Sequence, residues 1–163
     1  MSGHVLVYDA GMLIALVDRK AKAVAIHEAA KSASHRPVLL GPVLAQVWRQ
    51  DPALAHRLGD VLGDCTVIQA RGAQFAMRTV SHTGVTVQCI PCTAGFTLVD
   101  YKRLGQILGT ARVPAKKRPD PVDAMVVLIA AHHRHAVICT SDPEDITAYS
   151  RTLNKPDLVI TQV

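Results

Sequence analysis

Aromatic residues are scarce in this chain of 163 residues: they make up 4% of it, with a single tryptophan. A core built mainly of large rings is therefore excluded, and Ala, Val, Leu and Ile must supply most of the buried apolar surface. Hydrophobic residues still reach 49% of the chain, which excludes an intrinsically disordered protein. Small and branched apolar residues in this proportion are typical of a sheet covered by helices on both faces.

The chain also lacks a long hydrophobic run, since none approaches the ~18–20 residues that a membrane-spanning helix requires. The first apolar run begins at Val5 and is stopped by the charged Asp9. No basic segment precedes it, so it predicts a strand and not a secretory signal. We therefore expect a cytoplasmic protein without membrane contact. Its cysteines number only four, and most of them should be reduced in that compartment.

Acidic residues are fewer than basic ones, 13 against 18, which gives a formal net charge of +5. This basic bias is compatible with a polyanionic partner such as nucleic acid. A surplus of this size is equally compatible with solubility alone, so charge does not identify the partner.

No repeat, low-complexity tract or linker divides the chain, and its length fits a single domain over residues 1–163. Short, continuously apolar runs predict parallel strands that are buried on both faces, and helical spacing of apolar residues predicts helices between them. The alternation of the two predicts an α/β domain with a mainly parallel sheet. The expected strands are 4–8, 38–40, 65–68, 86–90, 136–140 and 158–161, and the expected helices are 10–18, 20–34, 42–49, 52–62, 73–81, 96–108, 121–133 and 143–153.

Three aspartates stand where such a fold keeps its ligands. Asp9 and Asp142 each follow directly after a predicted strand, and Asp123 lies in the first turn of a predicted helix. In open parallel sheets, ligands bind outside the carboxyl ends of the strands. Several carboxylates at one crevice repel each other, and a hard cation such as Mg²⁺ or Mn²⁺ relieves the repulsion. Such a cation can activate water and stabilise the charge that develops on a phosphate during hydrolysis.

Helix capping is the alternative explanation for each of these aspartates. Asp120 followed by Pro121 is the usual start of a helix, and Asp123 would then interact favourably with the helix dipole. The same pattern recurs from Asp142, and Asp9 could cap the helix that follows it. Taken singly, these residues leave both interpretations open.

Four segments occur in order along the chain: VLVYDAGMLIALVDR from Val5, PVLAQVWRQ from Pro42, DPVDAMVVLIAA from Asp120 and ICTSDPEDI from Ile138. None is specific alone, but four in this order at these spacings form a specific signal. Together they resemble the PIN-domain nuclease family, in particular its VapC-like toxins of actinobacterial type. The resemblance covers residues 4–51 and about 84–148.

This resemblance implies a three-layer α/β/α sandwich and a Mg²⁺- or Mn²⁺-dependent endoribonuclease. For the VapC-like branch it further implies the toxin of a type II toxin–antitoxin pair, a homodimer, an RNA substrate and a small antitoxin that blocks the site. The positions that match the metal ligands, and hence the catalytic residues, are Asp9, Asp123 and Asp142. The positions expected to support them are Gln46, Asp120, Ser141 and Asp145.

Two departures from the family pattern bear on activity. Many members have a glutamate where this chain has Gln46, whose amide brings no charge, so metal should bind less tightly. A second interpretation therefore stands beside the nuclease: a PIN-fold protein with little catalysis that binds RNA or a partner. Residues 64–83 also resemble an insertion, and we assign them no role.

Three further features of the sequence bear on its function. The basic segment Lys116, Lys117 and Arg118 either contacts the RNA backbone by its phosphates or is a solvated loop. Cys89 and Cys92 have the spacing of a redox motif, but the first lies in a predicted strand, which favours buried structural cysteines. A phosphate-transferring enzyme of the haloacid-dehalogenase type would have a second aspartate two residues after the first, where this chain has Gly11.

Overall fold

The computed structural model describes residues 4–48, 52–68, 95–114, 117–155 and 157–163. Its centre is a five-stranded sheet with the order β3-β2-β1-β4-β5, in which every neighbouring pair is parallel. The strands are β1 (Val5–Tyr8), β2 (Val38–Leu40), β3 (Thr66–Ile68), β4 (Ala136–Thr140) and β5 (Leu158–Gln162). The prediction of an α/β domain with a mainly parallel sheet is confirmed.

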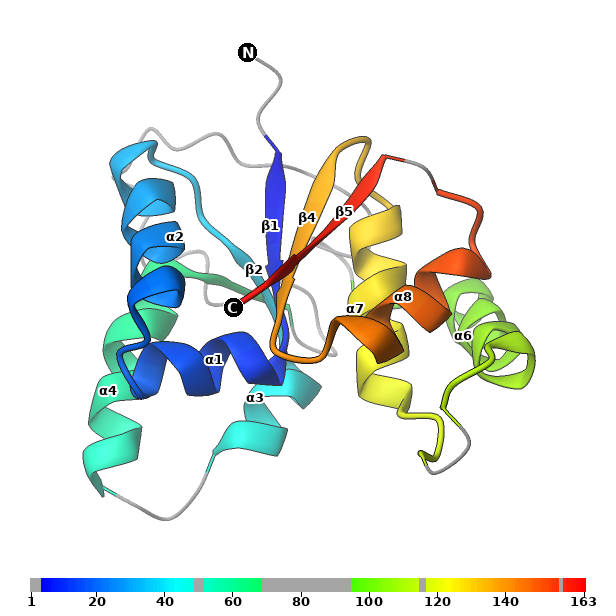
Figure 1. Cartoon of the computed structure of the whole chain (residues 1–163), viewed down its shortest axis with the longest axis horizontal. Helices are drawn as coiled ribbons and strands as arrows, with labels where there is room; N and C mark the ends of the chain where they lie inside the picture. Colours follow the sequence, from blue (N-terminus) through cyan, green and yellow to red (C-terminus); the bar gives the residue numbers. More distant parts are fainter. Residues whose placement is uncertain (1–3, 49–51, 69–94, 115–116, 156) are drawn as a thin grey trace.

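Helices cover both faces of this sheet, which makes the three-layer α/β/α arrangement that was expected. Figure 1 shows α1, α2 and α4 on one side of the strands and α6, α7 and α8 on the other. Helix α1 contacts α2, α3 and α4, whereas α7 contacts α6 and α8. The helices are α1 (Ala10–Val17), α2 (Ala21–Ser32), α3 (Gly41–Val47), α4 (Pro52–Asp64), α6 (Leu98–Thr110), α7 (Pro121–Ala131) and α8 (Pro143–Arg151).

The apolar runs of the sequence form the core, because the central strands are covered from both sides. β2 is buried along its whole length, and Val7, Leu39 and Ile138 are fully inaccessible. The expected inner face of α1 is buried as well, and so is most of α7. Burial of such side chains contributes about 1.5–3 kcal/mol each and is the main favourable term in folding.

The strand order places a topological switch point between β1 and β4. From β1 the chain proceeds to β2 and β3 on one side of the sheet, and it returns to add β4 and β5 on the other. Tyr8 at the end of β1 pairs with Cys139 near the end of β4. In α/β sheets the crevice at such a point is where ligands bind. Asp9 and Asp142 follow these two strand ends, so the sheet brings them together.

The boundaries of the described elements agree with the predicted ones to within a few residues. Helix α6 begins at Leu98, two residues later than expected, because the Thr97 and Asp100 side chains form a reciprocal capping box at its start. The predicted strand that ends at Ile68 is present as the edge strand β3, so the start of segment 64–83 belongs to the sheet. Residues 69–83, the predicted strand 86–90, and Cys89 with Cys92 lie outside the described residues, and those predictions stay untested.

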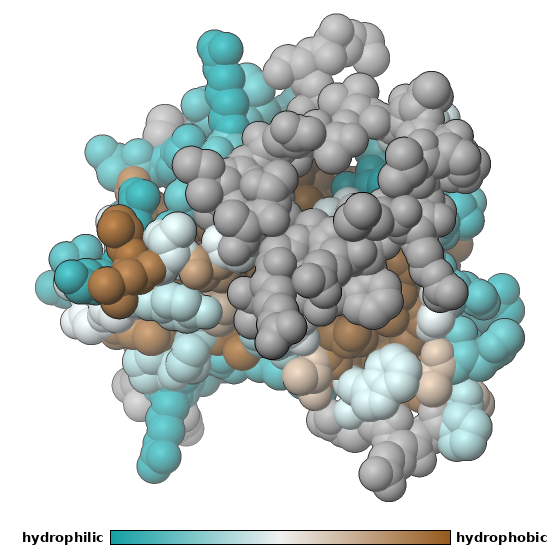
Figure 2. All heavy atoms as spheres, turned by 180° about the vertical axis from the view of Figure 1, so that it is seen from behind, coloured by the Kyte–Doolittle hydropathy of each residue, from teal (hydrophilic) through white to brown (hydrophobic). Residues whose placement is uncertain are grey.

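Three of the six large exposed apolar side chains among the described residues lie at the start of α6. Leu98 and Val99 are 71% and 72% exposed, and Tyr101 is half exposed. The space-filling view from behind shows apolar surface at the edge of the molecule where α6 lies (Figure 2). Within the described ranges, no helix combines the length and the apolarity that crossing a bilayer would demand.

Candidate functional site

Asp9 begins the site, directly after β1. Its Oδ1 accepts a hydrogen bond of 2.7 Å from the backbone N–H of Met12, so the side chain caps α1. The capping interpretation is therefore confirmed for Asp9, but it accounts for one oxygen of a carboxylate that is only 5% exposed. Burial raises the pKa of Asp9, and the nearby charge of Asp142 adds to this, although hydrogen bonds from Thr140, Met12 and Gly11 act in the opposite direction.

Thr140, the last residue of β4, connects Asp9 to Asp142. Its side chain is fully buried, and its hydrogen bond to the Asp9 carboxylate stabilises the charged form of that group. The same hydroxyl oxygen accepts a hydrogen bond of 2.9 Å from the backbone N–H of Asp142. One side chain thus sets the position of two of the predicted metal ligands relative to each other. Thr140 is not among the residues predicted from the sequence, although a hydroxyl at a strand end, two residues before an aspartate, was an available signal.

Gly11 allows the two strand ends to approach each other closely. A Cβ at this position would lie 2.7 Å from the backbone nitrogen of Ser141 and 2.8 Å from its Cβ. The first turn of α1 therefore packs directly on the loop between β4 and α8. Ser141, which was predicted to support the metal ligands, packs against the first turn of α1. A second aspartate at position 11, as in haloacid dehalogenases, has no room in this arrangement.

Replacing Gly11 with alanine is expected to lower the free energy of unfolding by about 1–3 kcal/mol, because the added methyl group overpacks the contact with Ser141. Urea unfolding followed by circular dichroism measures the change. Gly59→Ala in α4 is the matched control, since a Cβ there meets nothing within 4 Å and gains up to about 1 kcal/mol of helix propensity. A Gly11→Ala protein as stable as the parent would contradict the close approach.

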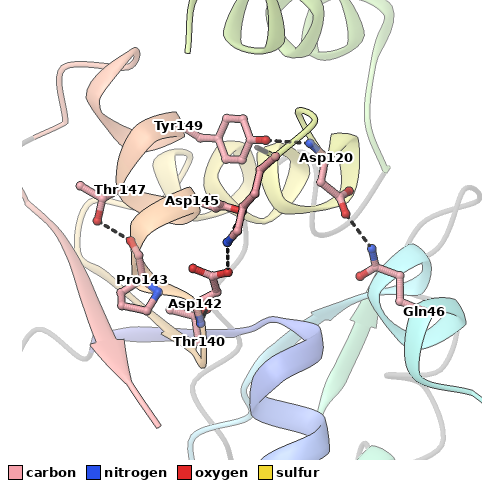
Figure 3. A network of polar contacts seen from close by, with 9 residues as sticks. Gln46, Asp120, Thr140, Asp142, Pro143, Asp145, Thr147 and Tyr149 are labelled. Atoms are coloured by element: carbon pink, nitrogen blue, oxygen red, sulfur yellow. Dashed lines mark hydrogen bonds and ion pairs between the residues drawn. The ribbon is translucent and has the colours of Figure 1, made fainter. Parts of the chain in front are cut away.

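Asp120 anchors the start of α7 from three sides. Its Oδ1 accepts a hydrogen bond of 2.7 Å from the backbone N–H of Val122, which confirms the predicted cap. Its backbone N–H donates to the hydroxyl of Tyr149 on α8, at 2.7 Å, and Gln46 on α3 donates its amide to Oδ2, at 3.2 Å. Figure 3 shows Asp120 between Tyr149 and Gln46. Helices from both faces of the sheet are thereby connected at this residue.

Asp123 lies one turn into α7 and is the most electrostatically perturbed carboxyl of the group. It is half-buried, and in the described part of the chain no hydrogen bond reaches its side chain. Burial, together with the charges of Asp120, Asp9, Asp145 and Asp142, raises its pKa to about 7. The other four predicted aspartates therefore lie close enough to Asp123 for their charges to act on it.

Asp142 and Asp145 complete the cluster at the start of α8. Asp142 occupies the cap position but makes no capping hydrogen bond, so the capping interpretation is wrong for its side chain. Its Oδ2 pairs instead with the Lys117 ammonium, which also lies 3.1 Å from Oδ2 of Asp145. Figure 3 shows both carboxylates at the start of α8, with this ion pair dashed. Oδ1 of Asp145 is buried and has no hydrogen-bond partner.

Of the described residues in the basic segment 116–118, only Lys117 contacts the aspartates of the site. The ammonium of Lys117 is held by two carboxylates, whose hydrogen bonds raise its pKa, so it stays charged. Arg118 is exposed, and Lys116 lies outside the described residues. Contact of these three side chains with RNA therefore stays a prediction. Tyr149, which we did not anticipate, could have been found from its position one helical turn after Asp145.

The donor set suits a hard divalent cation, because five carboxylates and an amide offer oxygen ligands only. Within the described ranges, no group of three or more His, Cys, Asp or Glu side chains is arranged to hold a metal ion. In this arrangement Oδ1 of Asp9 and Oδ1 of Asp120 accept helix-cap hydrogen bonds, and Oδ2 of Asp142 pairs with Lys117. Three features suit a metal ion: the oxygen ligands, the buried oxygen of Asp145 that has no partner, and the raised pKa of Asp123. Binding of a metal ion would require these carboxylates to reorient.

Comparisons of the chain with protein-family models, with curated proteins and with solved structures found no match.

Proposed function

We propose that the chain is a PIN-type, metal-dependent endoribonuclease, and that it acts as the toxin of a toxin–antitoxin pair. The observation that carries the proposal is the convergence of Asp9, Asp123 and Asp142, with Asp120 and Asp145 beside them, at the switch point of a parallel sheet. The four ordered segments that resemble the family supply the nuclease assignment. The predicted homodimer, antitoxin and RNA target are parts of the same proposal.

Asp9, Asp123 and Asp142 would hold Mg²⁺ or Mn²⁺. When bound, the cation supplies an activated water and offsets the negative charge that develops on the phosphate. The chain's own residues prepare for this. Thr140 and the first turn of α1 position Asp9, and Tyr149 positions the start of α7. Burial and, to a smaller extent, the neighbouring carboxylates raise the pKa of Asp123 to about 7. A divalent charge would offset the repulsion among these carboxylates and favour the ionised form of Asp123.

Chelation tests this function. The chain is expected to cleave mixed-sequence RNA oligonucleotides in Mn²⁺ and to lose the activity in EDTA. Without the metal, the carboxylates offer no Lewis acid to activate water or to stabilise the negative charge on the phosphate. Gel analysis of end-labelled RNA measures the cleavage, and restored activity on adding excess Mn²⁺ is the control. Equal cleavage in EDTA and in Mn²⁺ would overturn the proposal.

A second candidate function is an RNA- or partner-binding protein with little catalysis. The engagement of Asp142 and Asp145 by Lys117, together with the neutral amide of Gln46 beside Asp120, favours it. The same experiment separates the two candidates. RNA binding in a gel-shift assay that is equal with and without EDTA, without cleavage in Mn²⁺, would support the binding protein.

A further inference from the structure

Lys117 is the one basic side chain of the described residues that forms an ion pair with the acidic cluster. It comes from the segment before α7, and it bridges Asp142 at the cap position of α8 with Asp145 in the first turn of that helix. One ammonium therefore draws together two carboxylates that are expected to lie at the metal. An ammonium and a divalent cation are both attracted to carboxylate oxygens and repel each other, so they compete for the same pair of carboxylates.

The neutralisation by Lys117 is incomplete. The charges of four aspartates act on Asp123, and among the described residues only the ammonium of Lys117 forms an ion pair with this group. Lys117 reaches Oδ2 of Asp145, whereas Oδ1 of that residue stays buried without a partner. The cluster thus keeps negative charge that one ammonium does not offset and that a doubly charged ion would offset better.

The ion pairs of Lys117 with Asp142 and Asp145 can also break and re-form. Its side chain is 41% exposed, and that of Asp142 is 50% exposed, so water competes for both groups. Ion pairs at this exposure stabilise a protein by little and weaken with salt. Lys117 can therefore leave the carboxylates without unfolding the site.

We propose that Lys117 is a built-in competitor of the divalent cation, so that metal enters the cluster only as the ammonium leaves Asp142 and Asp145. This inference rests on the proposed function, because it assigns a regulating residue to the same metal site. Lys117 then has two roles, one before and one during metal binding. It stabilises the acidic cluster while no metal is bound, and it sets the metal concentration at which the site fills.

Calorimetric titration of the full chain with Mn²⁺ at low ionic strength tests the proposal. Lys117→Met is expected to bind Mn²⁺ about fivefold more tightly than the parent, the scale of a partly exposed ion pair. Lys117→Arg keeps the charge and should bind like the parent. Arg118→Met removes the same charge one residue away, from a side chain that has no ion pair among the described residues, and should change the affinity by less than about twofold.

The outcomes separate this inference from the proposed function. Equal affinity of the parent and Lys117→Met, or weaker binding by the variant, overturns the competition and leaves the metal site in place. Absence of Mn²⁺ binding in all four proteins overturns both proposals. Equal gains in Lys117→Met and Arg118→Met also overturn the competition, because the effect would then be one of net charge. A second readout needs no metal: in EDTA, Lys117→Met should unfold at a lower temperature than Lys117→Arg, since its carboxylates lose their counter-charge.

Discussion

Replacing Asp9 with asparagine is expected to slow RNA cleavage in Mn²⁺ by about 100-fold or more, the scale on which a lost electrostatic contact to the reacting groups acts. Asparagine caps a helix as well as aspartate does, so the hydrogen bond from Met12 to the side chain can persist. The substitution therefore removes the charge at this position and keeps the start of α1. Cleavage of end-labelled RNA, measured at saturating Mn²⁺, gives the rate.

The same variant should be at least as stable as the parent in EDTA. The pKa of Asp9 is raised in the folded protein, chiefly by burial. At pH values above that pKa, the buried charge of Asp9 therefore lowers the stability of the folded state. A neutral amide removes this cost, and the melting temperature should be equal or higher at neutral pH. Loss of activity with retained stability would show that the charge serves function and not the fold.

Asp18→Asn is the matched control for Asp9→Asn, because Asp18 stands at the other end of α1 with an exposed side chain. It should leave the rate of cleavage unchanged. Unchanged cleavage by the Asp9→Asn protein would sink the assignment of Asp9 as a metal ligand.

Gln46→Glu is expected to tighten Mn²⁺ binding by about tenfold, because it adds a carboxylate to the proposed metal site. Gln46 donates to Oδ2 of Asp120 at 3.2 Å, so a glutamate would place two carboxylates in contact. Without metal the pair repels, and the free energy of unfolding should fall by about 1 kcal/mol. Calorimetry with Mn²⁺ and thermal unfolding in EDTA measure the two effects.

Gln106→Glu is the control for this substitution. Gln106 is exposed on α6, and the change introduces the same charge on the protein surface. It should alter neither metal affinity nor stability appreciably. If Gln46→Glu bound Mn²⁺ no better than Gln106→Glu, Gln46 would not lie at the metal, and its amide would serve only to hold Asp120.

Much of the fold was predictable because buried parallel strands have a simple sequence pattern. Strands covered on both faces must be continuously apolar, which the runs that became β1, β2 and β4 are. Caps were nearly as informative: the Asp120–Pro121 pair begins α7 as predicted. The Asp142–Pro143 pair also begins a helix, α8, but the Asp142 carboxylate makes no capping hydrogen bond and pairs with Lys117, 25 residues away. Local sequence cannot choose between a near partner and a distant one.

By itself, the sequence determined the alternation of strands and helices, and with it the placement of Asp9 and Asp142 at strand ends. Only the tertiary structure decided which residues meet there. The order β3-β2-β1-β4-β5 sets the ends of β1 and β4 side by side. The assembled fold also brings Thr140, Tyr149 and Lys117 into contact with aspartates of other segments. Such contacts depend on the crossing of elements that are distant in the chain, so their chemistry exists only once the sheet has assembled.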